Sequence, residues 1–191
     1  MGDKQDIEYI KKLFFDKFGI VLNKIPESNQ KRTPDFEFAE KGLIQFVCEL
    51  KTLECVEPSE ETGYKKGDEE GEFWRDGDAA AKKIAHIILD DAHEQLTNYD
   101  CPRVLIFLNK NFDIDWQDYV KAIHGYLPFV DQRGRKTKLH WWHRISDGKI
   151  KKIKKDIDLY IWIDKVGDGQ VRFDLLTDRG RRLAEKYFKL D

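Results

Sequence analysis

Cysteine is scarce in this chain, with three residues among 191. Cys48, Cys55 and Cys101 form an odd and scattered set. Such a set argues against a disulfide framework, and also against a four-cysteine zinc or iron–sulfur site. Cys48 lies in an apolar run, so we expect it to be a small buried residue.

Long apolar runs are also missing. No stretch of about eighteen apolar residues occurs, so the sequence predicts no transmembrane helix. Residues 1–12 lack the apolar core of a signal peptide. We therefore expect a cytoplasmic protein with no membrane partner. Hydrophobic residues still make up 40% of the chain and aromatic residues 13%, which is enough to bury a core within a single domain.

Charge is divided unevenly along the chain. Residues 1–100 hold 14 Lys and Arg against 23 Asp and Glu, whereas residues 101–191 hold 20 against 13. An acidic half beside a basic half is typical of a metal site next to a phosphate-binding surface. It also fits two halves that attract each other for folding alone.

Hydrophobic spacing and turn residues predict an α/β fold. The predicted helices cover residues 4–18, 79–97, 115–127 and, capped by Thr177, 178–189. The predicted strands cover residues 20–25, 34–38, 43–50, 104–108, 159–163 and 171–176, and residues 55–78 are expected to be a long polar loop. A further hairpin is expected to turn at Ser146–Lys149, between strands over 138–145 and from 150 onward. The helix-strand-strand-strand-helix-strand order indicates a sandwich with a mixed sheet. Its core spans about 4–110, and a β-rich C-terminal extension with the basic hairpin spans about 111–191.

One constellation of charged residues points to chemistry. Asp35 follows Pro34 on one strand of the predicted 34–50 hairpin, and Glu49 and Lys51 continue the buried second strand. Residues two apart on a strand share a face, so Glu49 and Lys51 project together and Asp35 can reach them. Two close carboxylates repel each other and favour a cation between them. Their hard oxygen ligands, with the backbone carbonyl of Leu50, suit Mg²⁺ or Mn²⁺.

This pattern resembles the PD-(D/E)XK nuclease superfamily. The resemblance rests on Pro34-Asp35, the apolar run before Glu49-Leu50-Lys51, and the element order, and it covers about residues 4–110. It implies a restriction-endonuclease-like core and Mg²⁺-dependent cleavage of DNA, with Asp35, Glu49 and Lys51 as the catalytic residues.

Two further positions match branches of that family. Glu8 lies on the first helix, where some members carry an upstream acidic metal ligand. Gln95 and Tyr99 resemble the Q-x-x-x-Y motif of the RecB-like branch, and their spacing places them on one helix face. The chain departs from parts of that branch, because it has no iron–sulfur cysteine cluster and no histidine upstream of Asp35.

Each site residue also has a plain structural interpretation. Asp35 could be a turn residue, and Glu49 with Lys51 could form only a mutual salt bridge. Glu8 could be a solvated helix residue, and Gln95 with Tyr99 an ordinary helix end. The acid-x-lysine string also recurs at Asp147-Gly148-Lys149, where a turn is expected.

A basic tract with interleaved aromatic residues covers residues 133–155. We expect it to contact DNA, because lysine and arginine neutralise phosphates and exposed aromatic rings stack on bases. The alternative is a solvated edge hairpin whose lysines discourage strand pairing. The residues expected to bind nucleic acid are Arg133, Arg135, Lys136, Lys138, Arg144, Lys151 and Lys152.

Two functions of different classes therefore stay open. The leading one is a metal-dependent deoxyribonuclease acting in repair, recombination, or restriction and defence. The alternative is a non-catalytic module of the nuclease fold that binds nucleic acid or a protein. A weaker third is an acidic protein-binding surface on residues 55–78. The sequence leaves a homodimer open, since many enzymes that cut both strands act as dimers.

Overall fold

The computed structural model describes residues 4–26, 32–54, 64–66, 73–75, 78–130, 133–140, 145–167 and 169–190. Helices α1, α2, α3, α4, α6 and α7 span Lys4–Phe18, Ala79–Ile87, His93–Thr97, Trp116–His124, Lys149–Ile153 and Asp178–Tyr187. A π-helical turn, η2, spans Ile88–Ala92, and a 3-10 turn, η3, spans Lys154–Asp156. Strands β1 to β5 span Asn23–Lys24, Phe36–Glu40, Leu43–Leu53, Tyr64–Lys66 and Phe73–Arg75, and strands β6 to β10 span Arg103–Asn109, Tyr126–Val130, Lys136–His140, Leu159–Asp164 and Val171–Leu175.

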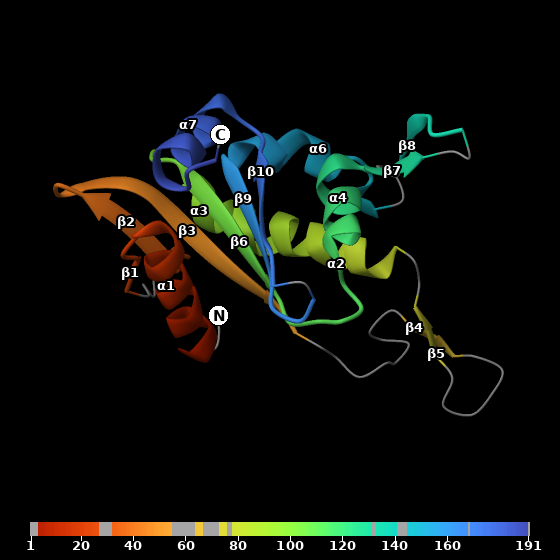
Figure 1. The fold of residues 1–191 in the computed structure, drawn as a ribbon, viewed down its shortest axis with the longest axis horizontal. Helices are drawn as coiled ribbons and strands as arrows, with labels where there is room; N and C mark the ends of the chain where they lie inside the picture. Colours follow the sequence, from red (N-terminus) through yellow and green to blue (C-terminus); the bar gives the residue numbers. More distant parts are fainter. Residues whose placement is uncertain are drawn as a thin grey trace.

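A six-stranded mixed sheet organises these elements, in the order β1-β2-β3-β6-β9-β10 (Figure 1). The three inner strands β3, β6 and β9 run parallel, while β2 and β10 pair antiparallel on either side of them. The predicted α/β class with a mixed sheet is therefore confirmed. Of the extension predicted over 111–191, strands β9 and β10 join the main sheet, whereas β7 and β8 form a separate two-stranded sheet.

The sheet separates two hydrophobic clusters. One contains Val47 and Leu53 of β3 together with residues of α2, α3, α4 and α6. The other contains Cys48 and Leu50 of β3 together with residues of α1 and α7. Alternate residues of a strand face opposite sides, so beyond the β-bulge at residue 45 the odd-numbered residues 47–53 face the α2–α4 layer and the even-numbered ones face α1 and α7.

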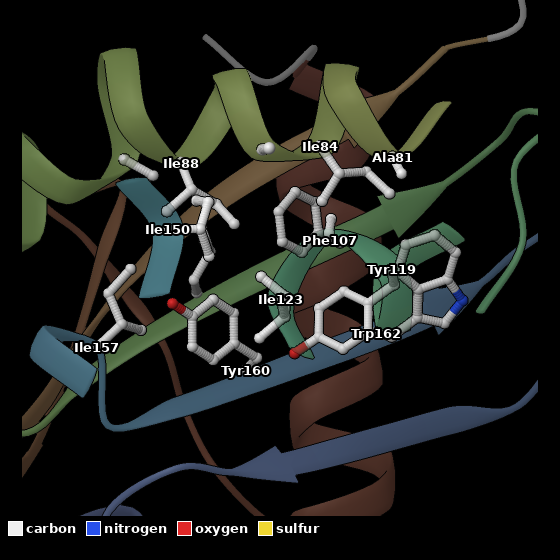
Figure 2. Packing of buried hydrophobic residues seen from close by; sticks show 14 of the residues in the cluster. Ala81, Ile84, Ile88, Phe107, Tyr119, Ile123, Ile150, Ile157, Tyr160 and Trp162 are labelled. Carbon is white, nitrogen blue, oxygen red and sulfur yellow. The ribbon is translucent and has the colours of Figure 1, made fainter. Parts of the chain in front are cut away.

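The cluster beneath α2 and α4 is rich in aromatic side chains. Figure 2 shows Ile84 pointing from the helix toward Phe107 and Ile88 pointing toward Ile150, with Tyr119 and Trp162 filling the space next to Phe107. Rings of this size bury much apolar area and fix the distance between helices and sheet. This packing holds the α2–η2–α3 segment firmly over β3 and β6.

The α2–η2–α3 segment has an unusual core spacing. Its buried residues Ala80, Ile84, Ile88, Ala92 and Leu96 follow one another at intervals of four, with the buried Ala81 and Ala85 beside this stripe. On an α-helix with 3.6 residues per turn, each such step would rotate the apolar stripe by roughly 40°. The wider π turn at Ile88–Ala92 takes up this drift, and such turns are frequent at functional sites.

Several local predictions are confirmed. The hairpin of β2 and β3 is present, and Cys48 is buried. Thr177 caps α7 by accepting a hydrogen bond from the Gly180 N–H at 2.9 Å. The helix predicted over 115–127 ends at His124, because Gly125 has a positive φ of 66°. No helix among the described residues is long and apolar enough to cross a membrane.

Two predictions are wrong. The hairpin expected at Ser146–Lys149 does not form, because Gly148 with φ 75° begins helix α6 instead. The basic hairpin is made by β7 and β8, whose register pairs Tyr126 with His140. The region 55–78 is also more than a loop, since β4 and β5 pair antiparallel within it.

Candidate active site

Asp35 and Glu49 meet because β2 and β3 pair antiparallel. Phe36 lies opposite Cys48 in the register, so the preceding residue Asp35 lies beside Glu49. The backbone N–H of Asp35 donates to Glu49 Oε2 at 3.2 Å. The N–H of Leu50 donates to Asp35 Oδ2 at 2.9 Å. The structure thus brings the two predicted carboxylates together, and each one accepts a backbone hydrogen bond from the neighbouring chain segment.

Lys51 projects from the same face of β3 as Glu49, and both are buried, with 9% and 2% of their surfaces exposed. The Lys51 ammonium lies 2.7 Å from Glu49 Oε1, so the salt bridge kept as the plain alternative is present. The ammonium also contacts the Asp91 carboxylate and donates to Gln95 Oε1 at 3.0 Å. Its three N–H donors therefore match three protein acceptors.

The helical segment supplies one predicted residue and one that was missed. Gln95, predicted from its motif, contacts Lys51 and also donates from Nε2 to the Thr33 carbonyl at 3.4 Å. Asp91 was not predicted. It lies four residues before Gln95, and residues four apart share a helix face, so that spacing was the available signal.

Arg32 is the second residue that was missed. Its Nη1 donates to Asp91 Oδ1 at 3.0 Å and to the Asp90 carbonyl at 3.4 Å. It also lies 3.8 Å from Glu94 Oε2. The available sequence signal for Arg32 was its position just before Thr33-Pro34-Asp35. We call the whole group the Lys51 network. It consists of Arg32, Asp35, Glu49, Lys51, Asp91 and Gln95.

Burial dominates the electrostatics of the two paired carboxylates. Burial raises the pKa of Glu49 to about 7, with the Asp35 charge adding to the rise and Lys51 opposing it. Burial also raises the pKa of Asp35, although the Leu50 hydrogen bond works against this. Burial alone would lower the pKa of Lys51, but the charges of Glu49 and Asp91 outweigh it and raise that pKa. The site thus favours positive charge near its carboxylates.

Glu8, the acidic metal ligand predicted on α1, makes none of the described contacts of the Lys51 network. Glu8 is exposed and pairs with Lys11 at 3.5 Å on its own helix, so its solvated interpretation is the one the structure favours. The inward acid of α1 is Asp6, whose Oδ1 lies 2.7 Å from Lys110 Nζ. Asp6 Oδ2 accepts from Thr52 Oγ1 at 3.0 Å. Thr52 faces the α1 side of β3, so Asp6 lies across the sheet from Lys51.

Tyr99 does not join the Lys51 network in the described contacts. It packs partly buried against the cluster beneath α2 and α4, and its carbonyl accepts from Arg103 Nε at 2.9 Å. Burial raises the pKa of its hydroxyl. Of the two residues of the predicted motif, only Gln95 reaches Lys51.

The basic tract is divided between two elements. Arg133, Arg135 and Lys136 are exposed at and beside the turn of the β7–β8 hairpin, whereas Lys151 and Lys152 are exposed on α6. Lys138 lies on β8, and Arg144 lies outside the described residues.

Helix α6 contacts η2, the turn that carries Asp91. Next to this contact, His93 Nε2 lies 2.8 Å from Asp156 Oδ2. Within the described part of the basic tract, the lysines of α6 thus lie on a helix that contacts η2, whereas the β7–β8 hairpin projects away from the sheet (Figure 1).

The donor set suits a hard divalent cation, although it is small. Among the described residues, no group of three or more His, Cys, Asp or Glu side chains is arranged to hold a metal ion. Asp35 and Glu49 supply two carboxylates. The Leu50 N–H points toward Asp35, and the carbonyl of a strand residue points to the same side as its N–H. Two carboxylates and one carbonyl leave several positions for water, the arrangement that Mg²⁺ prefers.

Comparison with known proteins leaves the family open. No family model matches the chain, and neither a curated protein nor a solved structure matches it. Function must therefore be argued from the Lys51 network itself. Buried like charges beside a lysine are the kind of perturbed cluster found at reactive sites.

Proposed function

We propose that this chain is a divalent-metal-dependent nuclease that hydrolyses DNA phosphodiester bonds. The observation that carries the proposal is the pairing of Asp35 with Glu49 across adjacent strands, with Lys51 two residues further on the same face. The pattern of these residues resembles the PD-(D/E)XK nucleases. Repair, recombination, or restriction and defence are the processes in which such an activity serves.

The residues have distinct roles in this proposal. The Asp35 and Glu49 carboxylates, with the Leu50 carbonyl, would hold Mg²⁺ or Mn²⁺. When bound, such an ion polarises a phosphodiester oxygen and lowers the pKa of a water molecule. Lys51 would orient the attacking water or stabilise charge that develops on the phosphate. Its burial strengthens that interaction, because the surroundings screen charge less than water does.

DNA is the proposed partner, and α6 is the surface that we propose contacts it near the site. Lys151 and Lys152 are exposed on a helix that contacts η2. Lysines neutralise phosphates with release of counterions. Arg133, Arg135 and Lys136 on the β7–β8 hairpin would contact more distant parts of a long substrate.

The decisive experiment is cleavage of linear, circular and branched DNA in the presence of Mg²⁺ or Mn²⁺. Glu49→Gln and Lys51→Met should each lower the rate by at least about 100-fold, the usual effect of removing a catalytic group. The preferred DNA would also show whether the enzyme cuts ends, internal bonds or branches.

A matched control is available in the same chain. Asp147 and Lys149 repeat the acid-x-lysine string, but Asp147 lies in a turn with φ 50°. Asp147→Asn should therefore cleave at the wild-type rate. Metal-dependent cutting that survives unchanged in Glu49→Gln would show that another site is responsible.

One observation favours the non-catalytic alternative. All three donors of Lys51 have protein acceptors, which is also what a purely structural ion network would show. A binding module of this kind would bind DNA equally well with and without the substitutions at Glu49 and Lys51. It would show no cleavage on any of the three substrates.

Compartment and assembly are parts of the proposal. Cys48 and Cys101 are unpaired thiols, which suits a reducing compartment such as the cytoplasm. Cutting both strands of a duplex in one binding event would use two sites, so we propose a homodimer on DNA. Sedimentation with and without a short duplex would test it, and a single copy bound at saturation would contradict it.

A further inference from the structure

Asp91 links two cations at the rim of the site. It lies on the π-helical turn Ile88–Ala92. Its Oδ2 contacts the Lys51 ammonium, and its Oδ1 accepts from Arg32 Nη1 at 3.0 Å. The Asp91 side chain is 40% exposed, against 11% for Lys51. Core packing therefore does not explain why this side chain meets a buried lysine.

Lys51 depends on acceptors from two different elements. Glu49 lies on its own strand, whereas Asp91 and Gln95 come from the helical segment. A lysine side chain is long and flexible, so its ammonium stays in one place only if several acceptors hold it. A divalent cation on Glu49 would compete with the ammonium for the same carboxylate. Asp91 would then be the charged acceptor that remains, and charged acceptors form the stronger hydrogen bonds.

We propose that Asp91 is the positioning residue for Lys51, keeping its ammonium beside the Asp35–Glu49 pair both in the metal-free protein and when Glu49 binds a cation. This inference rests on the proposed nuclease function. The Arg32 ion pair supports it, because it holds the second carboxylate oxygen and so opposes rotation of the Asp91 side chain. The π turn supports it as well, since it keeps Asp91 directed at the site while its neighbours Ile88 and Ala92 stay in the core.

The first test needs no activity. Lys51 in the metal-free protein is labelled with an amine-reactive reagent, and the extent of labelling over time is read by mass spectrometry. Asp91→Ala should raise the labelling rate of Lys51 about tenfold, the effect of losing one charge-assisted hydrogen bond. Asp90→Ala is the matched control, because Asp90 is the neighbouring acid on the same turn and its carboxylate lies 3.2 Å from His86. Equal labelling of Lys51 in the wild type and Asp91→Ala would overturn the proposal.

The second test is a double-mutant cycle in the cleavage assay. Asp91→Ala should lower kcat about tenfold or more and leave KM nearly unchanged, and Asp91→Glu should restore part of the rate. In a Lys51→Met background, Asp91→Ala should have no further effect, because a residue that acts through Lys51 has nothing left to position. An equal loss in both backgrounds, or a change confined to KM, would overturn the proposal.

The two tests separate this inference from the proposed function. If the wild type cuts no DNA, the nuclease proposal fails, while labelling still decides whether Asp91 holds Lys51. Thermal unfolding of each variant shows that it is folded. Asp91→Asn, which keeps the shape of the side chain, replaces Asp91→Ala if the alanine variant does not fold.

Discussion

Two partly buried polar networks lie on the same face of the sheet, near its opposite edges. The Lys51 network lies where β2 meets β3, and a second network centres on Asp174 of β10. Asp174 Oδ2 accepts from the Tyr119 hydroxyl at 2.9 Å and lies 2.7 Å from His124 Nε2. Nearby, the Tyr160 hydroxyl donates to the Lys154 carbonyl at 3.1 Å.

The difference lies in how charge is balanced. The Asp174 network centres on one carboxylate, which takes hydrogen bonds from neutral or titratable rings. The Lys51 network crowds the carboxylates of Asp35, Glu49 and Asp91 around two cations. Burial raises the pKa of Tyr119, helped by Asp174, so that hydroxyl stays a proton donor. A network that satisfies itself stabilises the fold, whereas one with surplus negative charge favours a further cation.

The largest expected difference concerns metal binding. Asp35→Asn and Glu49→Gln should each weaken Mn²⁺ binding by about 100-fold or more, because each removes one of two carboxylate ligands. Asp174→Asn should leave the affinity unchanged. Calorimetric titration of the three variants measures these affinities. An equal loss of Mn²⁺ affinity in Asp174→Asn and Glu49→Gln would show that the two networks do not differ in metal binding.

The next effect is on how the free energy of unfolding changes with pH in metal-free buffer. The pKa of Glu49 is about 7 in the folded protein and 4.5 in its unperturbed state. The folded state therefore holds its proton more tightly, and stability from this group falls as pH rises from 4.5 to 7. Glu49→Gln mimics the protonated form, so it should be more stable than the wild type at pH 8 by about 3 kcal/mol.

Urea unfolding at several pH values between 5 and 8 measures this effect. The advantage of Glu49→Gln should shrink toward pH 5, where the wild-type carboxyl is largely protonated. Asp174→Asn is the comparison variant at each pH. A constant difference between Glu49→Gln and the wild type over this range would contradict the raised pKa.

A smaller effect is expected from Asp174 itself. Asp174→Ala should destabilise the protein by about 1–3 kcal/mol, because it leaves the buried Tyr119 hydroxyl without its acceptor. Tyr119→Phe in the Asp174→Ala background should then recover part of the loss. Urea denaturation of the single and double variants tests the coupling, and purely additive effects would show that Tyr119 and Asp174 act independently.

The smallest effect concerns α6, which contacts both η2 and α4 and so lies between the two networks. Lys151→Gln with Lys152→Gln should weaken DNA binding by about threefold to tenfold. The slope of log affinity against log salt concentration should also become shallower, by the amount expected for the loss of up to about two phosphate contacts. Lys12→Gln with Lys17→Gln on α1, across the sheet, is the matched control. Equal weakening in both pairs would show that net charge alone drives binding.

Much of the fold was predictable because its signals are local. The apolar run of β3, the stripe of α2–η2–α3 and the Thr177 cap each follow from neighbouring residues. The helix α6 was misread because Ile150 and Ile153, separated by lysines, look as much like a strand as like one helical turn. The partner of β8 was also hidden, since Pro128 lies in β7 and proline weakens a strand prediction.

In the site, too, the local contacts were predictable and the distant ones were not. Asp35, Glu49 and Lys51 belong to one hairpin, so their spacing alone brought them together. Asp91 reaches Lys51 from 40 residues away, and Arg32 reaches Asp91 from 59. The spacing of Asp91 and Gln95 indicates that they share a helix face, but which strand that face meets depends on how the helix packs on the sheet, and no local pattern encodes this packing.

The span of these contacts also bears on the order in which the protein folds. Asp35 and Glu49 are joined within a hairpin, at a separation of 14 residues. The parallel pairing of Val47 with Arg103 must close a much longer loop, and the search for such distant partners slows folding. We therefore expect the carboxylate pair to form early, and Lys51 to gain its helical acceptors only when the crossover between β3 and β6 is complete.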